Sequence, residues 1–201
     1  FKNERTRPVH DLIGHIDLDA PGRILDIGCG PGNSSAVLAE RYPGSEIIGL
    51  DSSPAMIERA KKECLKARFL TEDGSKDLSH LGKFDLIFAN ASLQWMPDHA
   101  RLLRGYVKML QKGGAIAMQI PEFLQMPAAK ILAGAAASLQ FAGFFRDFDP
   151  GLHENPPRIL LQRAKPRQHA SQPVGDLLLP RSARLRRNHG VALIDRDEAL
   201  P

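Results

Sequence analysis

The chain has 201 residues, 43% of them apolar, with two cysteines and a formal net charge of +4. This length and apolar content are enough for one globular domain with an appended piece, and two cysteines do not indicate a disulfide scaffold. No apolar run has the roughly 18 residues of a membrane span, the start lacks a signal-peptide pattern and the histidines are dispersed, so we expect a cytoplasmic protein with neither membrane attachment nor a metal site.

The first predicted strand runs into a turn that is rich in glycine. Residues 24–27 are mostly apolar and include one acid, Asp26. Glycine then occupies every second position, at Gly28, Gly30 and Gly32. Glycine adopts positive φ and lets a ligand approach the backbone closely, so the segment predicts a strand that ends in a ligand-binding turn. Residues 34–41 supply the following helix.

The spacing of the glycines discriminates between ligand classes. A dinucleotide fingerprint is G-x-G-x-x-G, whereas the third glycine here comes one residue early. A phosphate-binding P-loop needs Lys followed by Ser or Thr after its last glycine, and none follows Gly32. The remaining pattern, D-x-G-x-G-x-G, resembles the first motif of the class I S-adenosylmethionine-dependent methyltransferases. The resemblance implies that the glycine turn lies against the amino-acid part of the cofactor and that Asp26 helps to hold the turn and the cofactor ammonium.

A second acid stands at the end of the next predicted strand, residues 46–50. Ligands of open α/β sheets bind at the carboxyl ends of the strands, which is where Asp51 lies. A dinucleotide fold uses an acid about 20 residues beyond its glycines to bind ribose hydroxyls, so only the glycine spacing separates the two classes. The methyltransferase resemblance implies that Asp51 accepts both ribose hydroxyls and that Ser52 also belongs to the cofactor site. Ser53 and Pro54 then begin a helix.

Three further strands are predicted downstream. Residues 69–71 precede Asp73 and Gly74, and the methyltransferase pattern implies that this acid meets the adenine amino group, with the glycine beside it. The next strand ends at Asn90, which the same pattern assigns to the cofactor site. A helix end, a Gly-Gly turn and another strand follow over residues 110–120. Strands that alternate with helices indicate an α/β protein with a Rossmann-like, doubly wound, mostly parallel sheet in a three-layer sandwich.

The middle of the chain narrows the resemblance to one family. The run Phe-Ala-Asn-Ala-Ser-Leu-Gln-Trp-Met-Pro-Asp-His over residues 88–99, together with residues 4–8 and 50–57, is similar to the trans-aconitate 2-methyltransferase family. The match extends from residue 1 to about residue 127. It implies S-adenosylmethionine as the cofactor and formation of a methyl ester on a carboxylate of trans-aconitate or a related small polycarboxylic acid.

This reaction makes modest demands on side chains. A carboxylate with a pKa of about 4 is already ionised near neutral pH, so no general base is needed and positioning dominates. Arg5 and Arg7 are candidates for binding the substrate carboxylates, because a guanidinium matches a carboxylate with two hydrogen bonds. Gln94 and Trp95 are the candidates for walls of the catalytic pocket. The structural alternatives are that Trp95 fills the core, that the two arginines are solvated, and that Asp51 is a helix-capping or solvated carboxylate.

The end of the chain differs from the rest in composition. Residues 158–201 carry nine Lys and Arg against four Asp and Glu, so this segment accounts for the net positive charge. It contains no aromatic residue, and prolines interrupt it. We therefore divide the chain into a methyltransferase domain, residues 1–157, and an Arg- and Pro-rich tail, residues 158–201.

The family resemblance does not extend into this tail, which leaves several hypotheses open. The tail is a divergent or disordered extension, or the product of a shifted reading frame. We expect a sheet that is incomplete at its C-terminal strands and a chain that begins later than a full family member. The alternatives to the main function are methylation of another small molecule, an inactive remnant, and a nucleic-acid binder with a basic tail. We favour a monomer that binds a small polycarboxylate and neither nucleic acid nor membrane.

Overall fold

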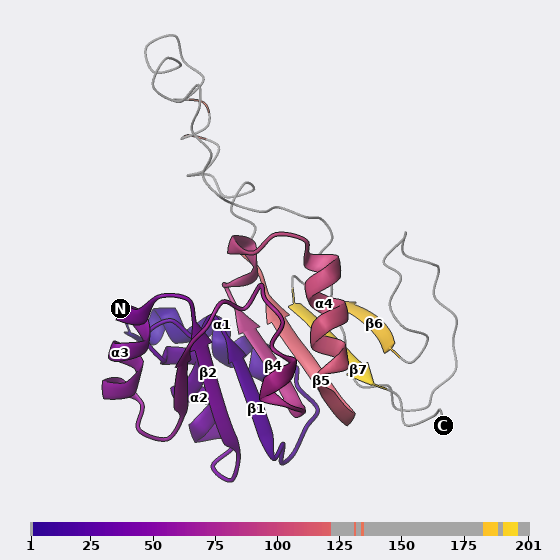
Figure 1. Ribbon diagram of the computed structural model, residues 1–201, viewed down its shortest axis with the longest axis horizontal. Coiled ribbons are helices and arrows are strands. Elements are labelled where there is room, and N and C mark those ends of the chain that lie inside the picture. Colours follow the sequence, from indigo (N-terminus) through magenta and orange to yellow (C-terminus); the bar gives the residue numbers. More distant parts are fainter. Residues whose placement is uncertain (1, 122–130, 132–133, 135–182, 189–190, 197–201) are drawn as a thin grey trace.

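A computed structural model describes residues 2–121, 131, 134, 183–188 and 191–196, and the side chains of residues 6–121, 131 and 134 among them. These residues are organised around one sheet with the strand order β3-β2-β1-β4-β5-β7-β6 (Figure 1). The strands are β1 (Arg23–Ile27), β2 (Glu46–Asp51), β3 (Arg68–Thr71), β4 (Phe84–Asn90), β5 (Leu110–Gln119), β6 (Ala183–Asn188) and β7 (Val191–Arg196). The α-helices are α1 (Lys2–Ile13), α2 (Asn33–Arg41), α3 (Pro54–Glu63) and α4 (His99–Lys108), with 3-10 turns η1 (Ser79–Leu81) and η2 (Leu93–Trp95).

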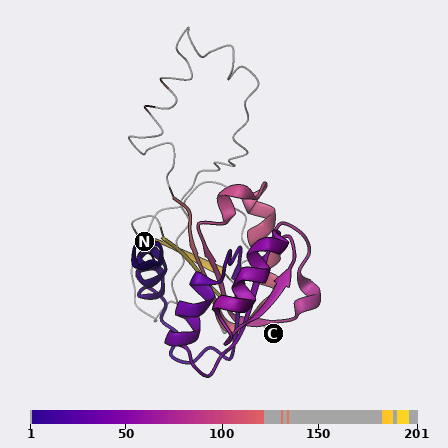
Figure 2. The same cartoon turned by 90° about the vertical axis from the view of Figure 1, so that its left-hand side faces the viewer.

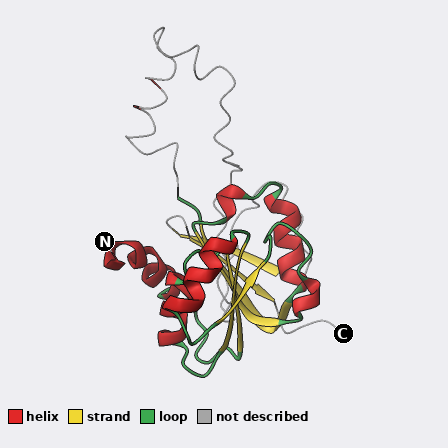
Figure 3. Ribbon diagram, turned by 60° about the vertical axis from the view of Figure 1, so that its left-hand side comes forward, coloured by secondary structure: helices red, strands yellow, loops and turns green. Residues whose placement is uncertain are grey.

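The first five strands are parallel and the last two are antiparallel to their neighbours. Strand β1 lies between β2 and β4, so the chain winds outward in both directions from the centre of the sheet. Helices cover both faces, with α4 in front of the strands and α1 behind them (Figure 1). Figure 2 turns the molecule by 90° and separates α1 and α4 on opposite sides, and Figure 3 shows the same three layers. The predicted Rossmann-like, mostly parallel, three-layer fold is confirmed.

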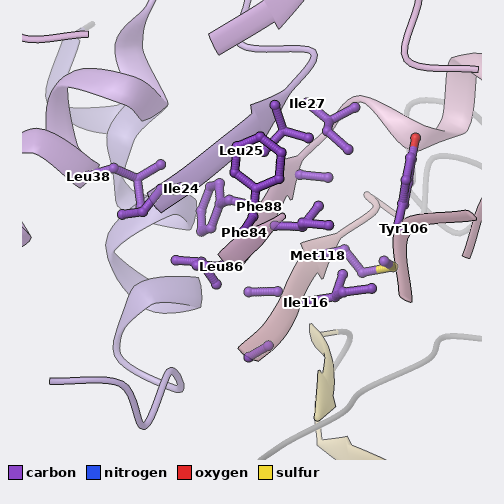
Figure 4. Packing of buried hydrophobic residues seen from close by; sticks show 14 of the residues in the cluster. Ile24, Leu25, Ile27, Leu38, Phe84, Leu86, Phe88, Tyr106, Ile116 and Met118 are labelled. Carbon is purple, nitrogen blue, oxygen red and sulfur yellow. The ribbon is translucent and has the colours of Figure 1, made fainter. Parts of the chain in front are cut away.

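The central strands form because their side chains are apolar on both faces. In β1, β2 and β4 nearly every residue is buried, which is the pattern of a parallel sheet covered by helices on both sides. The core packs Ile24 and Leu25 of β1 against Phe84, Leu86 and Phe88 of β4 (Figure 4). A rigid centre of this kind fixes the positions of the loops at the strand ends.

Two expectations about the later strands are wrong. The Gly-Gly pair was expected to form a turn before a strand, but β5 runs through it without interruption. Gly113 adopts φ 76°, and the pairing with β4 shifts register between Phe84 and Leu86, so the glycines absorb an irregularity inside the strand. The sheet was also expected to lack its last strands, whereas β7 pairs antiparallel with β5, and β6 with β7.

The physical reason lies in the local sequence of the two last strands. The tail as a whole contains several prolines and no aromatic residue. Residues 183–196, however, contain no proline, and residues 191–194 are apolar. Short proline-free segments of this kind can pair at a sheet edge. The boundary drawn at residues 157 and 158 lies outside the described residues, so it stays a prediction. Among the helices that the structure describes, none is both long enough and apolar enough to cross a membrane.

Candidate active site

Several of the predicted cofactor-binding residues lie at one edge of the sheet. Because β1 to β5 are parallel, their carboxyl ends meet at this edge, which is where open α/β sheets bind ligands. Asp51 is the last residue of β2, and Asn90 is the last residue of β4. The register pairs Asn90 with Gln119, the last residue of β5. Residues that are far apart in the sequence therefore come together here.

The glycine turn after β1 requires glycine for two different reasons. All three glycines have positive φ, at 69° for Gly28, 54° for Gly30 and 87° for Gly32. A Cβ on Gly28 would lie 2.3 Å from the Cβ of Ser92, and one on Gly32 would lie 3.2 Å from the Cβ of Ala60. A Cβ on Gly30 would meet no protein atom within 4 Å. Gly28 and Gly32 thus serve packing, whereas Gly30 faces open space.

Asp51 ties the glycine turn to the start of α3. Its Oδ2 accepts a hydrogen bond from the Gly30 amide (3.0 Å), and its Oδ1 accepts one from the Ser53 amide (2.9 Å). The alternative that Asp51 caps a helix is not confirmed, because the N-cap of α3 is Ser53, whose hydroxyl accepts from the Met56 amide. A carboxylate has about four lone-pair sites, so each oxygen keeps the capacity for one further donor. Asp51 is partly exposed and Ser52 beside it is exposed, which leaves both accessible to a ligand.

Asp26 is completely buried beneath the turn. Its Oδ2 accepts hydrogen bonds from the hydroxyls of Ser34 and Ser35, each at 2.6 Å. Its Oδ1 is buried and has no hydrogen-bond partner among the described residues. The pKa of Asp26 is raised to about 6, mainly by burial; the hydrogen bonds from Ser34 and Ser35 oppose this shift, and the negative charge of Asp51 adds to it.

The sequence analysis missed the two serines as partners of Asp26. Ser34 and Ser35 follow the glycine turn directly, and a pair of hydroxyls at a helix start is the signal that was available. The signal does not say which acceptor the hydroxyls reach, because that depends on how the turn folds back over β1. In the structure, both hydroxyls donate to Oδ2 of Asp26.

The Asp73–Gly74 turn follows β3 and is bound on its buried side by Tyr106 of α4. Asp73 is exposed, and its carboxylate accepts a hydrogen bond from the Ser75 amide (2.8 Å). Hydrogen bonds from Ser75 lower the pKa of Asp73. Gly74 is buried, and its carbonyl oxygen accepts a hydrogen bond from the Tyr106 hydroxyl (2.9 Å). The turn therefore presents an ionised carboxylate at the surface on a fixed backbone.

The segment after β4 carries the two predicted wall residues in different settings. Gln94 is buried, and its Nε2 donates to the Ala91 carbonyl (2.9 Å). Trp95 is 60% exposed, so the alternative that it fills the core is wrong. Ala91 has φ 52°, a strained conformation for a residue with a side chain, and such strain is concentrated at functional sites. The side-chain oxygens of Gln94 and Asn90 are buried without a described hydrogen-bond partner.

The two predicted substrate arginines lie on α1. The side chain of Arg5 lies outside the described side chains. Arg7 is exposed and forms no ion pair with any residue that the structure describes. Within the same residues, no cluster of three or more His, Cys, Asp or Glu side chains has the geometry to hold a metal ion.

Comparisons with known proteins agree with this arrangement. Residues 24–114 match the family model described as "Methyltransferase domain". The trans-aconitate 2-methyltransferase of Methylobacterium radiotolerans is 43% identical over 147 residues, which are 73% of this chain and 56% of the relative. Residues 24–114 therefore form a methyltransferase domain. A second relative, the trans-aconitate 2-methyltransferase of Enterobacter sp. (strain 638), is 40% identical over 75% of this chain and 59% of its own length.

Solved structures extend the comparison to the fold. The plantazolicin methyltransferase BpumL in complex with SAH superposes with a TM-score of 0.53 at 23% identity, covering 72% of this chain and 64% of that one. The O-methyltransferase of a Brevibacillus brevis multienzyme gives a TM-score of 0.51 at 18% identity, covering 58% and 42%. These structures show that the chain shares their fold. The chain spans about half the length of the curated relatives it matches, at 56% and 59%.

Proposed function

We propose that the chain is an S-adenosylmethionine-dependent carboxyl O-methyltransferase that forms a methyl ester on trans-aconitate or a related small polycarboxylic acid. The observation that carries the cofactor assignment is the open space at Gly30, next to a carboxylate that still has acceptor capacity. The names of the relatives support the substrate class. We further propose that the protein acts as a monomer in the cytoplasm, without nucleic-acid or membrane partners.

The residues present fit the proposed cofactor. Asp51 has lone pairs left for two ribose hydroxyls, and the exposed carboxylate of Asp73 suits the adenine amino group. The buried Oδ1 of Asp26 has no hydrogen-bond donor among the described residues, which fits the nearby binding of a cationic ammonium group. Gly30 lets a ligand reach the backbone of the turn. When bound, S-adenosylmethionine supplies a methyl group that is activated for transfer by its sulfonium.

The chain's own contribution to the reaction is orientation. The substrate carboxylate is ionised at neutral pH, so the protein does not have to remove a proton. Holding the reacting oxygen in line with the methyl group is worth about 7–11 kcal/mol of the barrier. Gln94 is fixed by its bond to the Ala91 carbonyl and Trp95 is exposed beside it, so this segment is the proposed wall of the acceptor site. Arg7 and Arg5 are the proposed partners for the other carboxylates.

Two measurements on the purified chain test this function. Calorimetric titration with S-adenosylhomocysteine measures cofactor affinity, and incubation with S-adenosylmethionine and trans-aconitate followed by mass spectrometry detects the methyl ester. We expect both binding and ester formation. Binding without ester would favour a different small-molecule acceptor, and absence of binding would overturn the proposal. Binding that falls steeply as salt rises would instead indicate a nucleic-acid binder, because phosphate contacts are strongly salt-dependent.

A further inference from the structure

Helix α4 makes a specific contact with the turn after β3. The ring of Tyr106 lies at the margin of the core, with its hydroxyl oxygen pointing away from Ile116 and Met118 (Figure 4). This hydroxyl donates to the Gly74 carbonyl at 2.9 Å, although the two residues are 32 positions apart in the sequence. Burial and the negative charge of Asp73 raise the pKa of Tyr106, so the hydroxyl keeps its proton at any physiological pH.

Gly74 is closely packed on the face where a side chain would stand. A Cβ on Gly74 would lie 2.8 Å from both Ile27 Cγ2 and Met96 Cε, so residues from the end of β1 and from the segment that carries Trp95 lie against this glycine. The Tyr106 hydroxyl also lies 3.8 Å from the sulfur of Met96. Three parts of the chain therefore meet at the Gly74 peptide.

The bond between Tyr106 and Gly74 adds to a set of hydrogen bonds that connect the loops of the proposed cofactor site. The Gly30 amide donates to Asp51, and the Asp51 carbonyl accepts a hydrogen bond from the Glu72 amide (3.1 Å). Asp73 follows directly, so the turn is tied to β2 at one end and to α4 at the other. Arg101 adds a second link from α4, since its Nη2 donates to the Ser75 carbonyl (3.2 Å). This link is exposed, whereas the Tyr106 bond is buried.

We infer that Tyr106 is a positioning residue for cofactor recognition, which holds the Asp73–Gly74 turn so that the Asp73 carboxylate meets the adenine amino group. The inference rests on the proposed function. Tyr106 touches neither the cofactor nor the acceptor, and acts only through the Gly74 carbonyl. The buried hydrogen bond from the Tyr106 hydroxyl fixes the position of the Asp73–Gly74 turn. The position of the Asp73 carboxylate in turn decides how well this acceptor distinguishes an amino group from an oxygen.

The test compares two ligands that differ along one edge of the base. S-adenosylhomocysteine carries the adenine amino group beside an unprotonated N1, and S-inosylhomocysteine carries an oxygen beside a protonated N1. We expect the wild-type protein to prefer the first ligand and Tyr106→Phe to reduce this preference about three- to tenfold, since one neutral hydrogen bond is lost. In an Asp73→Ala background the preference is absent, and adding Tyr106→Phe changes nothing further.

Tyr42→Phe is a matched control. Tyr42 is also buried, at 3% exposure, but its hydroxyl has no described hydrogen-bond partner, and it lies at the end of α2. This variant should keep the wild-type preference, and thermal unfolding checks that all variants are folded. If Tyr106→Phe weakens both ligands equally, or neither, the positioning role is wrong while the proposed function stands. If the wild-type protein binds neither ligand, the proposed function fails and this inference fails with it.

Discussion

Replacing Gly30 with Ala tests whether the open space in the glycine turn belongs to a ligand. The new Cβ would meet no protein atom within 4 Å, so the substitution creates no clash inside the protein. It does place a side chain at φ 54°, which costs about 1–2 kcal/mol for an L-residue. Gly113→Ala is the matched control, because Gly113 has φ 76° and equally open surroundings but lies in β5.

The two variants should lose similar stability and differ in binding. A cost of 1–2 kcal/mol lowers the melting temperature by about 2–8 °C in a chain of this size. If the cofactor packs against the Gly30 backbone, the added methyl group overfills that contact at a cost of about 1–3 kcal/mol. This corresponds to about 5- to 150-fold weaker binding. Gly113→Ala should bind S-adenosylhomocysteine as the wild type does.

Calorimetry with S-adenosylhomocysteine and thermal unfolding of the three proteins provide the assay. The expected pattern is equal shifts in melting temperature with a loss of affinity confined to Gly30→Ala. A folded Gly30→Ala protein with wild-type affinity would refute the reasoning, because the methyl group would then occupy space that no ligand uses. Equal losses of affinity in both variants would show that backbone strain, and not contact with the cofactor, weakens binding.

Three other changes follow from the site. The pKa of Asp26 is raised to about 6 in the folded state, so the folded protein binds more protons than the unfolded one between about pH 4 and 6. The free energy of unfolding of the ligand-free protein should therefore fall by up to about 3 kcal/mol as the pH rises from about 4 to 6. Urea titrations should show a smaller fall in Asp26→Asn, and parallel curves for the two proteins would contradict this reasoning. Gly28→Ala should lose about 2–5 kcal/mol of stability, because its Cβ would lie 2.3 Å from the Cβ of Ser92, and adding Ser92→Gly should restore part of the loss in denaturant unfolding. Arg7→Ala should raise the KM for trans-aconitate about tenfold in an ester-formation assay without changing the affinity for S-adenosylhomocysteine, and equal effects on both ligands would argue against a substrate contact.

Local features of the sequence predicted the centre of the fold well. The strand before the glycine turn and the helix that begins after Ser53 depend on nearby residues, since side-chain burial and capping act within a few positions. The Ser53 hydroxyl accepts from the Met56 amide, with Pro54 as the first helical residue, as the sequence suggests. The order of the elements was likewise predictable, because parallel strands need crossover connections.

The rest depends on contacts that distant parts of the chain make. Nothing near Tyr106 indicates that its hydroxyl reaches Gly74, and nothing near Trp95 indicates that its ring is exposed. The composition of residues 158–201 pointed away from strands, because averages over a long segment hide a short apolar run such as residues 191–194.

The placement of β7 between β5 and β6 has a consequence for synthesis on the ribosome. The five parallel strands come from one continuous stretch, which emerges and pairs before the last two strands exist. Until residues 191–196 arrive, the edge of β5 offers unpaired backbone groups along a buried apolar strand. Such an edge recruits strands from other chains, so the interval between the emergence of β5 and that of β7 is the period in which the nascent protein is most prone to aggregate.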